Sequence, residues 1–293
     1  MIDLHMHTVY SDGTNTCKEI LEKAKKNNLS YISITDHNNC GVYKELSNPE
    51  IRNIFKGKII RGVELNTKIL GIPIEILGYD VDTEYINKNV SNIYISNKER
   101  NIIEVKRIYD ICIKNKIEVG ENFVENYNPD MYASKYLHQI ITNNAENRKY
   151  IDEDAWENSN IFYRKYMSNP KTLFFVDTND IIPDFEQVSN LVKNAGGLVF
   201  IPHIYEYREN SEKILSNILK NYKIDGIECF YTTFTKEQNE YLLKLCKQNN
   251  YYISGGSDYH GDFKPGIEMA TGFGNLKIEE NIIDNWKDKV KLI

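Results

Sequence analysis

The chain has 293 residues, of which 41% are hydrophobic and 27% are charged, and its formal net charge is −6. This composition is typical of a globular protein with a substantial core, and it excludes a disordered or fibrous chain. A negative net charge gives no general attraction to duplex nucleic acid or to an anionic membrane. We therefore expect neither as a partner, and the oligomeric state stays open.

The five cysteines are scattered and include no C-x-x-C pair, which is typical of reduced thiols in a cytoplasmic protein. Asp3 and His5 interrupt the first apolar run, so we predict no signal peptide. No stretch approaches the roughly 20 apolar residues of a membrane-spanning helix. The sequence accordingly predicts a soluble, cytoplasmic protein.

The first predicted strand ends in two histidines, His5 and His7, and Asp12 follows on a turn. Side chains at positions i and i+2 of a strand point to the same face, so the two imidazoles can bind one divalent cation. A catalytic ion of the zinc type usually takes three protein ligands and keeps a position open for water. The pair therefore needs partners from elsewhere in the chain.

The following segments alternate helices with strands that carry polar side chains near their ends. Thr16, with Glu19 three residues later, predicts a capped helix to about residue 27. In parallel α/β proteins the carboxyl ends of strands form the functional sites. The candidates here are Asp36 and His37 after a strand at 31–35, Glu64 in a strand at 58–66, and Glu75 in the return strand 74–79 of a hairpin.

The segment 91–185 differs from the flanking sequence, because it is rich in Asn and Tyr and has helical apolar spacing. This spacing predicts helices at 96–116, 131–142 and 152–167. We interpret 91–185 as a helical insertion, which contains His138. The residues 1–90 and 186–293 then form one α/β domain.

The α/β pattern resumes after the insertion, with helices predicted at 187–194, 211–221 and 236–249 and strands at 198–203, 224–230 and 251–254. These strands or the turns after them carry His203, Glu228, Asp258 and His260. Polar groups thus follow strands in both halves of the predicted domain.

Five of the six histidines fall where a predicted strand gives way to a loop, namely His5, His7, His37, His203 and His260. A single such histidine is more often structural than a ligand, but five together reverse that preference. Carboxylates accompany them at Asp12, Asp36, Glu64 and Asp258. Imidazole and oxygen ligands suit Zn²⁺, Mn²⁺ or Fe²⁺ better than Ca²⁺. The number of candidate ligands exceeds what one ion needs and predicts two or three ions.

A site with several metal ions activates a bridging water and neutralises charge on the substrate oxygens, so hydrolysis is the expected reaction. The sequence has no G-x-S-x-G, Walker or G-x-G-x-x-G motif. Cys40 follows His37 closely, but we interpret it as a bystander thiol rather than a nucleophile.

These residues resemble the motifs of the PHP (polymerase and histidinol phosphatase) superfamily over nearly the whole chain. The matching motifs are His5-Met-His7, Asp12, Thr35-Asp36-His37, Gly62-Val63-Glu64, Pro202-His203 and Ser257-Asp258-Tyr259-His260. The chain looks most similar to stand-alone PHP phosphoesterases that hydrolyse nucleoside 3′,5′-bisphosphates and short oligonucleotide ends.

The resemblance implies a distorted, TIM-like (β/α)₇ barrel with a trinuclear metal centre. Carried over motif by motif, it implies one ion on His5, His7, Glu64 and Asp258, a second on Glu64, His203 and one further ligand, and a third on Asp12, His37 and His260. It also implies that His138 reaches the site as a catalytic residue.

The chain departs from the family pattern at several positions. Glu75 stands where the family usually has a histidine, and it can still coordinate a metal ion. Arginines that the family carries before His138 and after His203 are absent. Arginine binds phosphate through bidentate hydrogen bonds. The absence of these arginines therefore argues against a nucleotide substrate more than against hydrolytic chemistry. Candidate substitutes for substrate binding are Lys135, Arg164 and Arg208.

Two further side chains complete the predicted site. Asp36 is expected to orient a neighbouring catalytic group rather than to bind metal, and Tyr231, at the end of the strand with Glu228, is expected to contact the substrate. The leading prediction is a metal-dependent phosphoesterase that releases phosphate from a nucleotide, an oligonucleotide end or a small metabolite. The alternatives are a metal-dependent amide or ester hydrolase and a non-catalytic metal-binding regulatory module.

Overall fold

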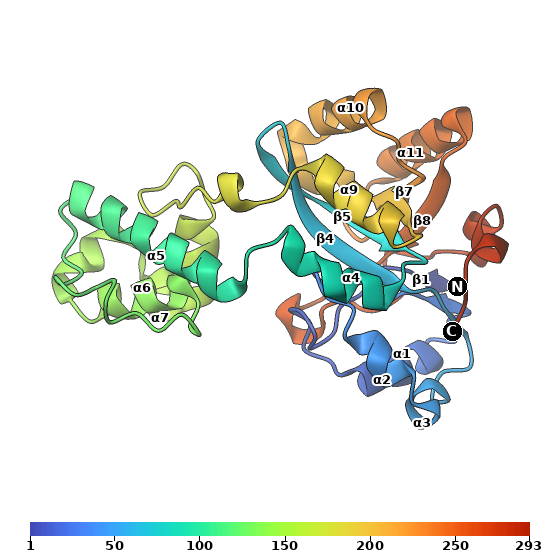
Figure 1. Ribbon diagram of the computed structural model, residues 1–293, viewed down its shortest axis with the longest axis horizontal. Coiled ribbons are helices and arrows are strands. Elements are labelled where there is room, and N and C mark those ends of the chain that lie inside the picture. Colours follow the sequence, from blue (N-terminus) through green and yellow to red (C-terminus); the bar gives the residue numbers. More distant parts are fainter. The chain divides into compact units, whose positions relative to one another are not determined.

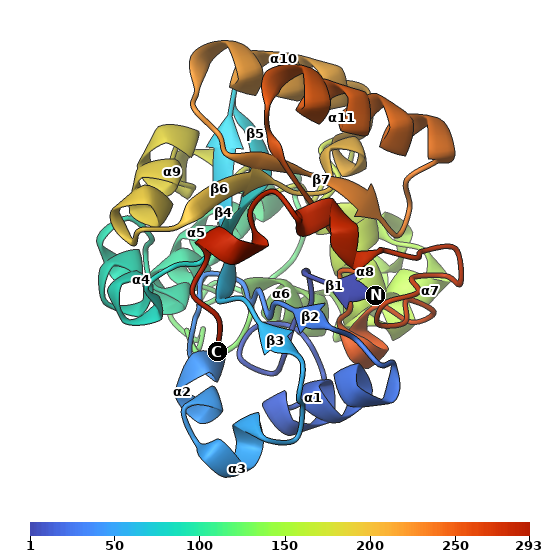
Figure 2. The same cartoon turned by 90° about the vertical axis from the view of Figure 1, so that its right-hand side faces the viewer.

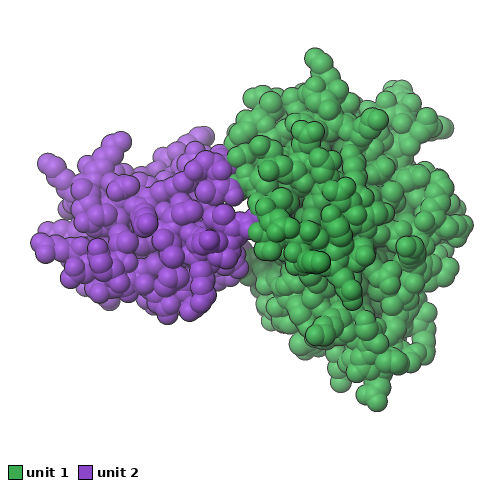
Figure 3. All heavy atoms as spheres, in the orientation of Figure 1, with its two compact units in different colours: residues 1–93, 182–293 green, residues 94–181 purple.

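The computed structural model describes residues 1–293, which divide into two compact units. Unit 1 comprises Met1–Ile93 and Ile182–Ile293, and unit 2 comprises Tyr94–Ile181 (green and purple in Figure 3). Unit 2 overlaps the segment 91–185 that the sequence predicts as an insertion. Each unit has its own buried cluster of apolar side chains.

Unit 1 contains two sheets. The three-stranded sheet is parallel, in the order β1 (Ile2–Asp3), β2 (Tyr31–Ile32) and β3 (Lys58–Ile59). The five-stranded sheet has the order β4 (Gly62–Ile69), β5 (Ile72–Tyr79), β6 (Leu198–Ile201), β7 (Gly226–Tyr231) and β8 (Tyr252–Gly256). Strand β5 runs antiparallel to both neighbours, whereas β6, β7 and β8 are parallel. The predicted α/β class is confirmed, and so is the hairpin.

Pairing between the two sheets is limited to isolated bridges, at Met6 with Tyr259 and at His37 with Glu64. The strands are therefore not closed into a barrel, and the predicted (β/α)₇ barrel stays a prediction. Both bridges lie beyond or near strand ends that carry candidate ligands. They bring the segments after β1, β2 and β8 together with the start of β4.

Seven α-helices accompany the sheets of unit 1. They are α1 (Cys17–Lys26), α2 (Val42–Leu46), α3 (Pro49–Arg52), α4 (Thr83–Asn89), α9 (Phe185–Asn194), α10 (Ser211–Asn221) and α11 (Lys236–Asn249). In Figures 1 and 2, α1, α2 and α3 lie on the side of the three-stranded sheet, and α9, α10 and α11 lie on the side of the five-stranded sheet. The predicted capping box is present, because Thr16 accepts from the backbone N–H of Glu19 and the Glu19 carboxylate accepts from that of Thr16.

Strand alternation separates the core of unit 1 from its polar side chains. Ile2 and Leu4 join a fully buried apolar cluster with residues of both sheets and with Trp286 of the C-terminal segment. The intervening Asp3 and His5 are equally buried but contact polar groups. The first strand thus contributes to the core and to the site at once.

Unit 2 is helical, with α5 (Asn97–Lys114), α6 (Ala133–Thr142), α7 (Glu153–Glu157) and α8 (Ser159–Phe162). The first two correspond to predicted helices. The predicted helix 152–167 is wrong as one element, because Asn158 has an extended backbone and its side chain caps α8. A π-helical turn at Tyr163–Met167 follows α8. Short polar side chains favour such caps over helix interiors.

None of the helices is both long enough and apolar enough to cross a membrane.

Candidate metal centre

The strand ends of unit 1 bring imidazoles and carboxylates into three adjoining groups. In each group the potential ligand atoms lie within 4.8 Å of one another. The groups are His7, Asp12, His37 and His260; His5, His7, Glu64 and Asp258; and His37, Glu64 and Glu75. His7, His37 and Glu64 each belong to two groups, so the groups form one continuous polar cluster, which we call the ligand cluster and to which we add His203.

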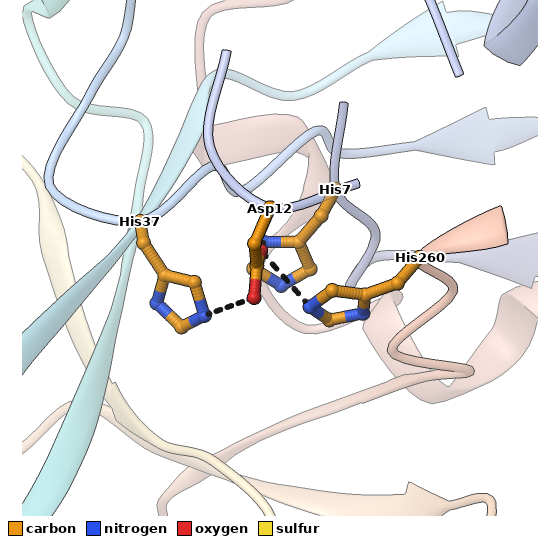
Figure 4. A group of neighbouring side chains, drawn as sticks. All are labelled: His7, Asp12, His37 and His260. Carbon is orange, nitrogen blue, oxygen red and sulfur yellow. Dashed lines mark ion pairs between the residues drawn. The ribbon is translucent and has the colours of Figure 1, made fainter. Parts of the chain in front are cut away.

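In the first group Asp12 lies among three imidazoles (Figure 4). Its Oδ1 is 3.2 Å from Nε2 of His260, and its Oδ2 is 3.8 Å from Nε2 of His37. The rings of His7 and His260 stack with centroids 4.0 Å apart. One carboxylate and two or three imidazoles therefore converge here from the N-terminal loop and the loops after β2 and β8.

In the second group two carboxylates face the histidine pair of the first strand. Nε2 of His5 is 3.1 Å from Oε2 of Glu64 and 3.4 Å from Oδ1 of Asp258. Nε2 of His7 is 3.2 Å and 3.3 Å from the same two oxygens. Both imidazoles thus point to the same side of the extended segment, as their spacing predicts.

Glu64 connects the second group with the third through its two oxygens. Oε1 lies 2.9 Å from Nε2 of His203, and Oε2 lies 3.5 Å from Nδ1 of His37. Glu75 contacts the same two histidines, at 3.4 Å from His203 and 3.8 Å from His37. The two oxygens of Glu64 therefore face different imidazoles, and this carboxylate links the second group to the third.

Residues around the ligand cluster fix the orientation of its imidazoles. The Glu228 carboxylate lies with Oε1 3.0 Å from Nδ1 of His5, and its Oε2 accepts a 2.7 Å hydrogen bond from the backbone N–H of His203. With Nδ1 of His5 bonded in this way, Nε2 is left for the ligand cluster, which is the usual arrangement of a metal-binding histidine. Tyr207 supports the neighbouring hairpin, since its hydroxyl accepts from the backbone N–H of Glu75 at 2.9 Å.

Asp36 is fully buried but belongs to none of the three groups. It accepts hydrogen bonds of 2.7 Å from the backbone N–H of Thr8, the hydroxyl of Thr8 and the hydroxyl of Ser11. These bonds shape the turn that leads to Asp12. The geometry agrees with an orienting function, which stays a prediction.

Asp258 is held on both sides of its carboxylate. Oδ1 faces the imidazoles, and Oδ2 accepts a 2.8 Å hydrogen bond from the hydroxyl of Tyr231 and contacts Nζ of Lys264. Asp3 fixes the preceding residue, because it accepts from the backbone N–H of Ser257 at 2.9 Å and from the Ser257 hydroxyl at 2.6 Å.

Sequence reasoning missed Asp3, Tyr207 and Lys264. Asp3 precedes His5 by two positions, as His5 precedes His7, so strand periodicity could have placed all three on the same face. No comparable signal marks Lys264 or Tyr207, since their contacts depend on how loops fold back onto the strands.

The charged groups of the ligand cluster lower the pKa of two of its carboxylates and raise the pKa of three of its histidines. Burial alone would raise the pKa of Glu64 and Asp258, but the surrounding imidazoles hold both pKa values well below their usual range. Burial alone would lower the pKa of the histidines, but the contacts and charges of the surrounding carboxylates raise the pKa of His7 and His203 to about 9 and that of His5 well above normal. A cation bound in the ligand cluster would therefore compete with protons for these imidazoles.

The pKa values of three further groups, at the edge of the ligand cluster, are also shifted. Burial and the Glu64 carboxylate raise the pKa of Glu75. Burial and the charge of His7 lower the pKa of His260. Burial would lower the pKa of Lys264, but the Asp258 carboxylate beside it raises it.

The donor set of the ligand cluster fits divalent cations. Several of its buried atoms have no hydrogen-bond partner, namely Nε2 of His7, Oδ1 of Asp12, Nδ1 of His37 and Nε2 of His260. Buried polar atoms are almost always paired, and unpaired imidazole nitrogens and carboxylate oxygens that converge are the ligands of Zn²⁺, Mn²⁺ or Fe²⁺.

Four other predicted site residues are not members of the three groups. His138, Lys135 and Arg164 belong to unit 2, where Nε2 of His138 is 2.9 Å from the carbonyl oxygen of Ala155. The catalytic function of His138 and the substrate contacts of Lys135 and Arg164 stay predictions. Arg208 lies in unit 1, is exposed, and has a left-handed backbone with φ of 50°.

The chain is similar to several known proteins over most of its length. The chain is 25% identical over 292 residues to a 5′-3′ exoribonuclease of Haemophilus influenzae, covering 97% of each protein. It is 20% identical to a 3′,5′-nucleoside bisphosphate phosphatase of Chromobacterium violaceum, covering 92% of this chain and 90% of that one. A proposed metal-dependent phosphoesterase of Bifidobacterium adolescentis has the same fold, with a TM-score of 0.68, 20% identity and coverage of 99% and 96%.

The family model described as "PHP domain" matches residues 3–254, which include all candidate ligands except Asp258 and His260. This match confirms the resemblance seen in the motifs, and the chain belongs to the PHP domain family.

Proposed function

We propose that this PHP-domain protein is a metal-dependent phosphoesterase that releases phosphate from a phosphomonoester of a nucleotide, an oligonucleotide end or a small metabolite. The observation that carries the proposal is the continuity of the ligand cluster. His7, His37 and Glu64 are shared between its groups, so ions bound in them would be neighbours. Neighbouring metal ions can activate a water molecule and neutralise the oxygens of a phosphate ester, and both effects favour hydrolysis.

The residues of the chain have distinct tasks in this proposal. His5, His7, Glu64 and Asp258 would hold one ion, Glu64 with His203 and Glu75 would hold a second, and Asp12, His37 and His260 would hold a third. When bound, such ions supply an activated water and neutralise the phosphate oxygens. Glu228 keeps Nε2 of His5 directed into the ligand cluster, and Asp36 fixes the turn before Asp12.

The relatives support the substrate class. Proteins that share most of their length with this chain act on nucleoside bisphosphates or on RNA ends, according to their names. We further propose that the ligand cluster binds two or three ions of Zn²⁺, Mn²⁺ or Fe²⁺. We also propose that the α/β unit is a distorted (β/α)₇ barrel and that the protein is cytoplasmic. The unpaired state of all five cysteines is in accord with that location.

The proposal is tested by stripping the protein with a chelator and reloading it with Zn²⁺, Mn²⁺ or Fe²⁺. We expect the reloaded protein to release phosphate from at least one member of a panel of phosphomonoesters, nucleoside 3′,5′-bisphosphates and 5′-phosphorylated oligonucleotides. We expect the stripped protein to release none. His5→Ala should lower both metal content and phosphate release. The control Lys277→Met, which changes an exposed side chain, should lower neither.

Other outcomes would favour the alternatives. Turnover of an amide or ester panel without phosphate release would indicate a hydrolase that acts on carbonyl groups. Stoichiometric metal without turnover of either panel would indicate a non-catalytic module. Unchanged metal content in His5→Ala would contradict the ligand assignment.

A further inference from the structure

The three groups of the ligand cluster consist of imidazoles and carboxylates, so a cationic side chain that contacts one of these carboxylates is a candidate for binding phosphate. Lys264 follows the 3₁₀ turn Gly261–Phe263 and contacts Oδ2 of Asp258 through Nζ. The sequence alone does not single it out.

The loop that carries Lys264 is fixed to the N-terminal loop of the site. The backbone N–H of Asp262 donates to the hydroxyl of Thr14 at 2.9 Å, and the backbone N–H of Lys264 donates to the carbonyl of Gly261 at 3.2 Å. Gly261 has φ of 66°, and a Cβ there would lie 2.2 Å from Oγ1 of Thr14. The start of the lysine side chain is therefore well positioned, whereas its four-carbon stem leaves the ammonium adaptable.

Lys264 is not needed to orient Asp258. The hydroxyl of Tyr231 already donates to Oδ2, and Oδ1 faces Nε2 of His5 and of His7. A neutral donor and two imidazoles fix both oxygens of the carboxylate. The ammonium adds a positive charge at the outer edge of the same carboxylate, and its side chain is 32% exposed. It is thus half-buried and accessible from solvent.

We propose that Lys264 is a substrate-binding residue whose ammonium pairs with the phosphoryl group of a terminal phosphomonoester. This inference rests on the proposed function. The Asp258 carboxylate contacts the ammonium in the structure. A cation held by Asp258 would offset the charge of that carboxylate and weaken its attraction for the ammonium, so a phosphate dianion would become the stronger partner. A lysine binds phosphate as a point charge without bidentate geometry, which accommodates varied leaving groups.

The test compares Lys264→Met, which keeps the length of the side chain, with Lys264→Arg, which keeps the charge. On metal-loaded protein we measure the metal content by elemental analysis, the affinity for inorganic phosphate by calorimetry, and KM and kcat for the best phosphomonoester. Losing one charge-assisted hydrogen bond should weaken phosphate binding and raise KM by roughly ten- to a hundredfold in Lys264→Met. We expect Lys264→Arg to retain most of the affinity, both variants to keep wild-type metal content, and the surface control Lys277→Met to match wild type.

Two results would overturn the inference. One is wild-type phosphate affinity in Lys264→Met. The other is a loss of metal from Lys264→Met that parallels its loss of phosphate binding, since this would make Lys264 a support of Asp258. If the wild-type protein releases no phosphate from any ester, the proposed function fails instead, whatever the Lys264 variants bind.

Discussion

Replacing Glu228 by glutamine tests how the orientation of His5 controls metal binding. The two carboxylate oxygens lie at Nδ1 of His5 and at the backbone N–H of His203, at 3.0 Å and 2.7 Å. Glutamine keeps the shape but has one acceptor oxygen and one N–H donor group. In Glu228→Gln, which changes a fully buried side chain, either one contact sets a donor against a donor, or His5 accepts at Nδ1 and carries its proton on Nε2, toward the ligand cluster.

The magnitude follows from those two contacts. Leaving one buried N–H without an acceptor costs about 1–3 kcal/mol of stability. Loss of the partner that orients a metal-bound histidine typically weakens metal affinity by about 10- to 100-fold, which corresponds to about 1.4–2.8 kcal/mol. We expect Glu228→Gln to weaken metal affinity in either case and to lower stability where a donor faces a donor, because the same carboxylate supports two histidines of the ligand cluster.

The assay is a competition titration of Zn²⁺ or Mn²⁺ against a chromophoric chelator, with denaturant unfolding of the metal-free protein beside it. Glu240→Gln is the matched control, because Glu240 is exposed on α11 and pairs only loosely with Lys236 at 3.7 Å. Wild-type metal affinity and stability in Glu228→Gln would refute the reasoning from the two hydrogen bonds.

Two further predictions follow from the electrostatics and hydrogen bonds of the ligand cluster. In the metal-free protein His7 and His203 have pKa values of about 9, above the usual 6.5; the stability that they contribute is complete below pH 6.5 and is lost as the pH rises through 9. The melting temperature of the metal-free protein should therefore fall as the pH rises over this range. Stabilisation by added Zn²⁺ or Mn²⁺ should increase over the same range, because fewer protons compete for the imidazoles. A stabilisation by metal that decreases with rising pH would contradict this prediction. Tyr231→Phe removes the hydroxyl that donates to Asp258, so we expect weaker metal retention with KM little changed. A large rise in KM at full metal content would instead support the predicted substrate contact of Tyr231.

Local patterns account for much of what the sequence predicts. The spacing of His5 and His7 directs both Nε2 atoms to the same side of the extended segment, as predicted. The capping box at Thr16 and the hairpin before Glu75 form as predicted. These features depend on residues close in sequence, so periodicity and capping chemistry are sufficient to predict them.

The same local rules fail where tertiary contacts compete with them. Apolar spacing over 152–167 predicts one helix, but the side chain of Asn158 bonds to backbone N–H groups and starts a new helix. The closed barrel that the family resemblance implies is not seen as continuous pairing, because pairing between the two sheets is confined to isolated bridges.

The sequence by itself determined the kinds of ligand, their places at strand ends and the membership of the PHP domain family. Only the tertiary structure decided that Glu64 faces His203 with one oxygen and His37 with the other, that Glu228 holds His5, and that Lys264 reaches Asp258. His5 and Glu228 are separated by 223 positions in the chain. Such contacts depend on strand order and register, which local composition and periodicity do not specify.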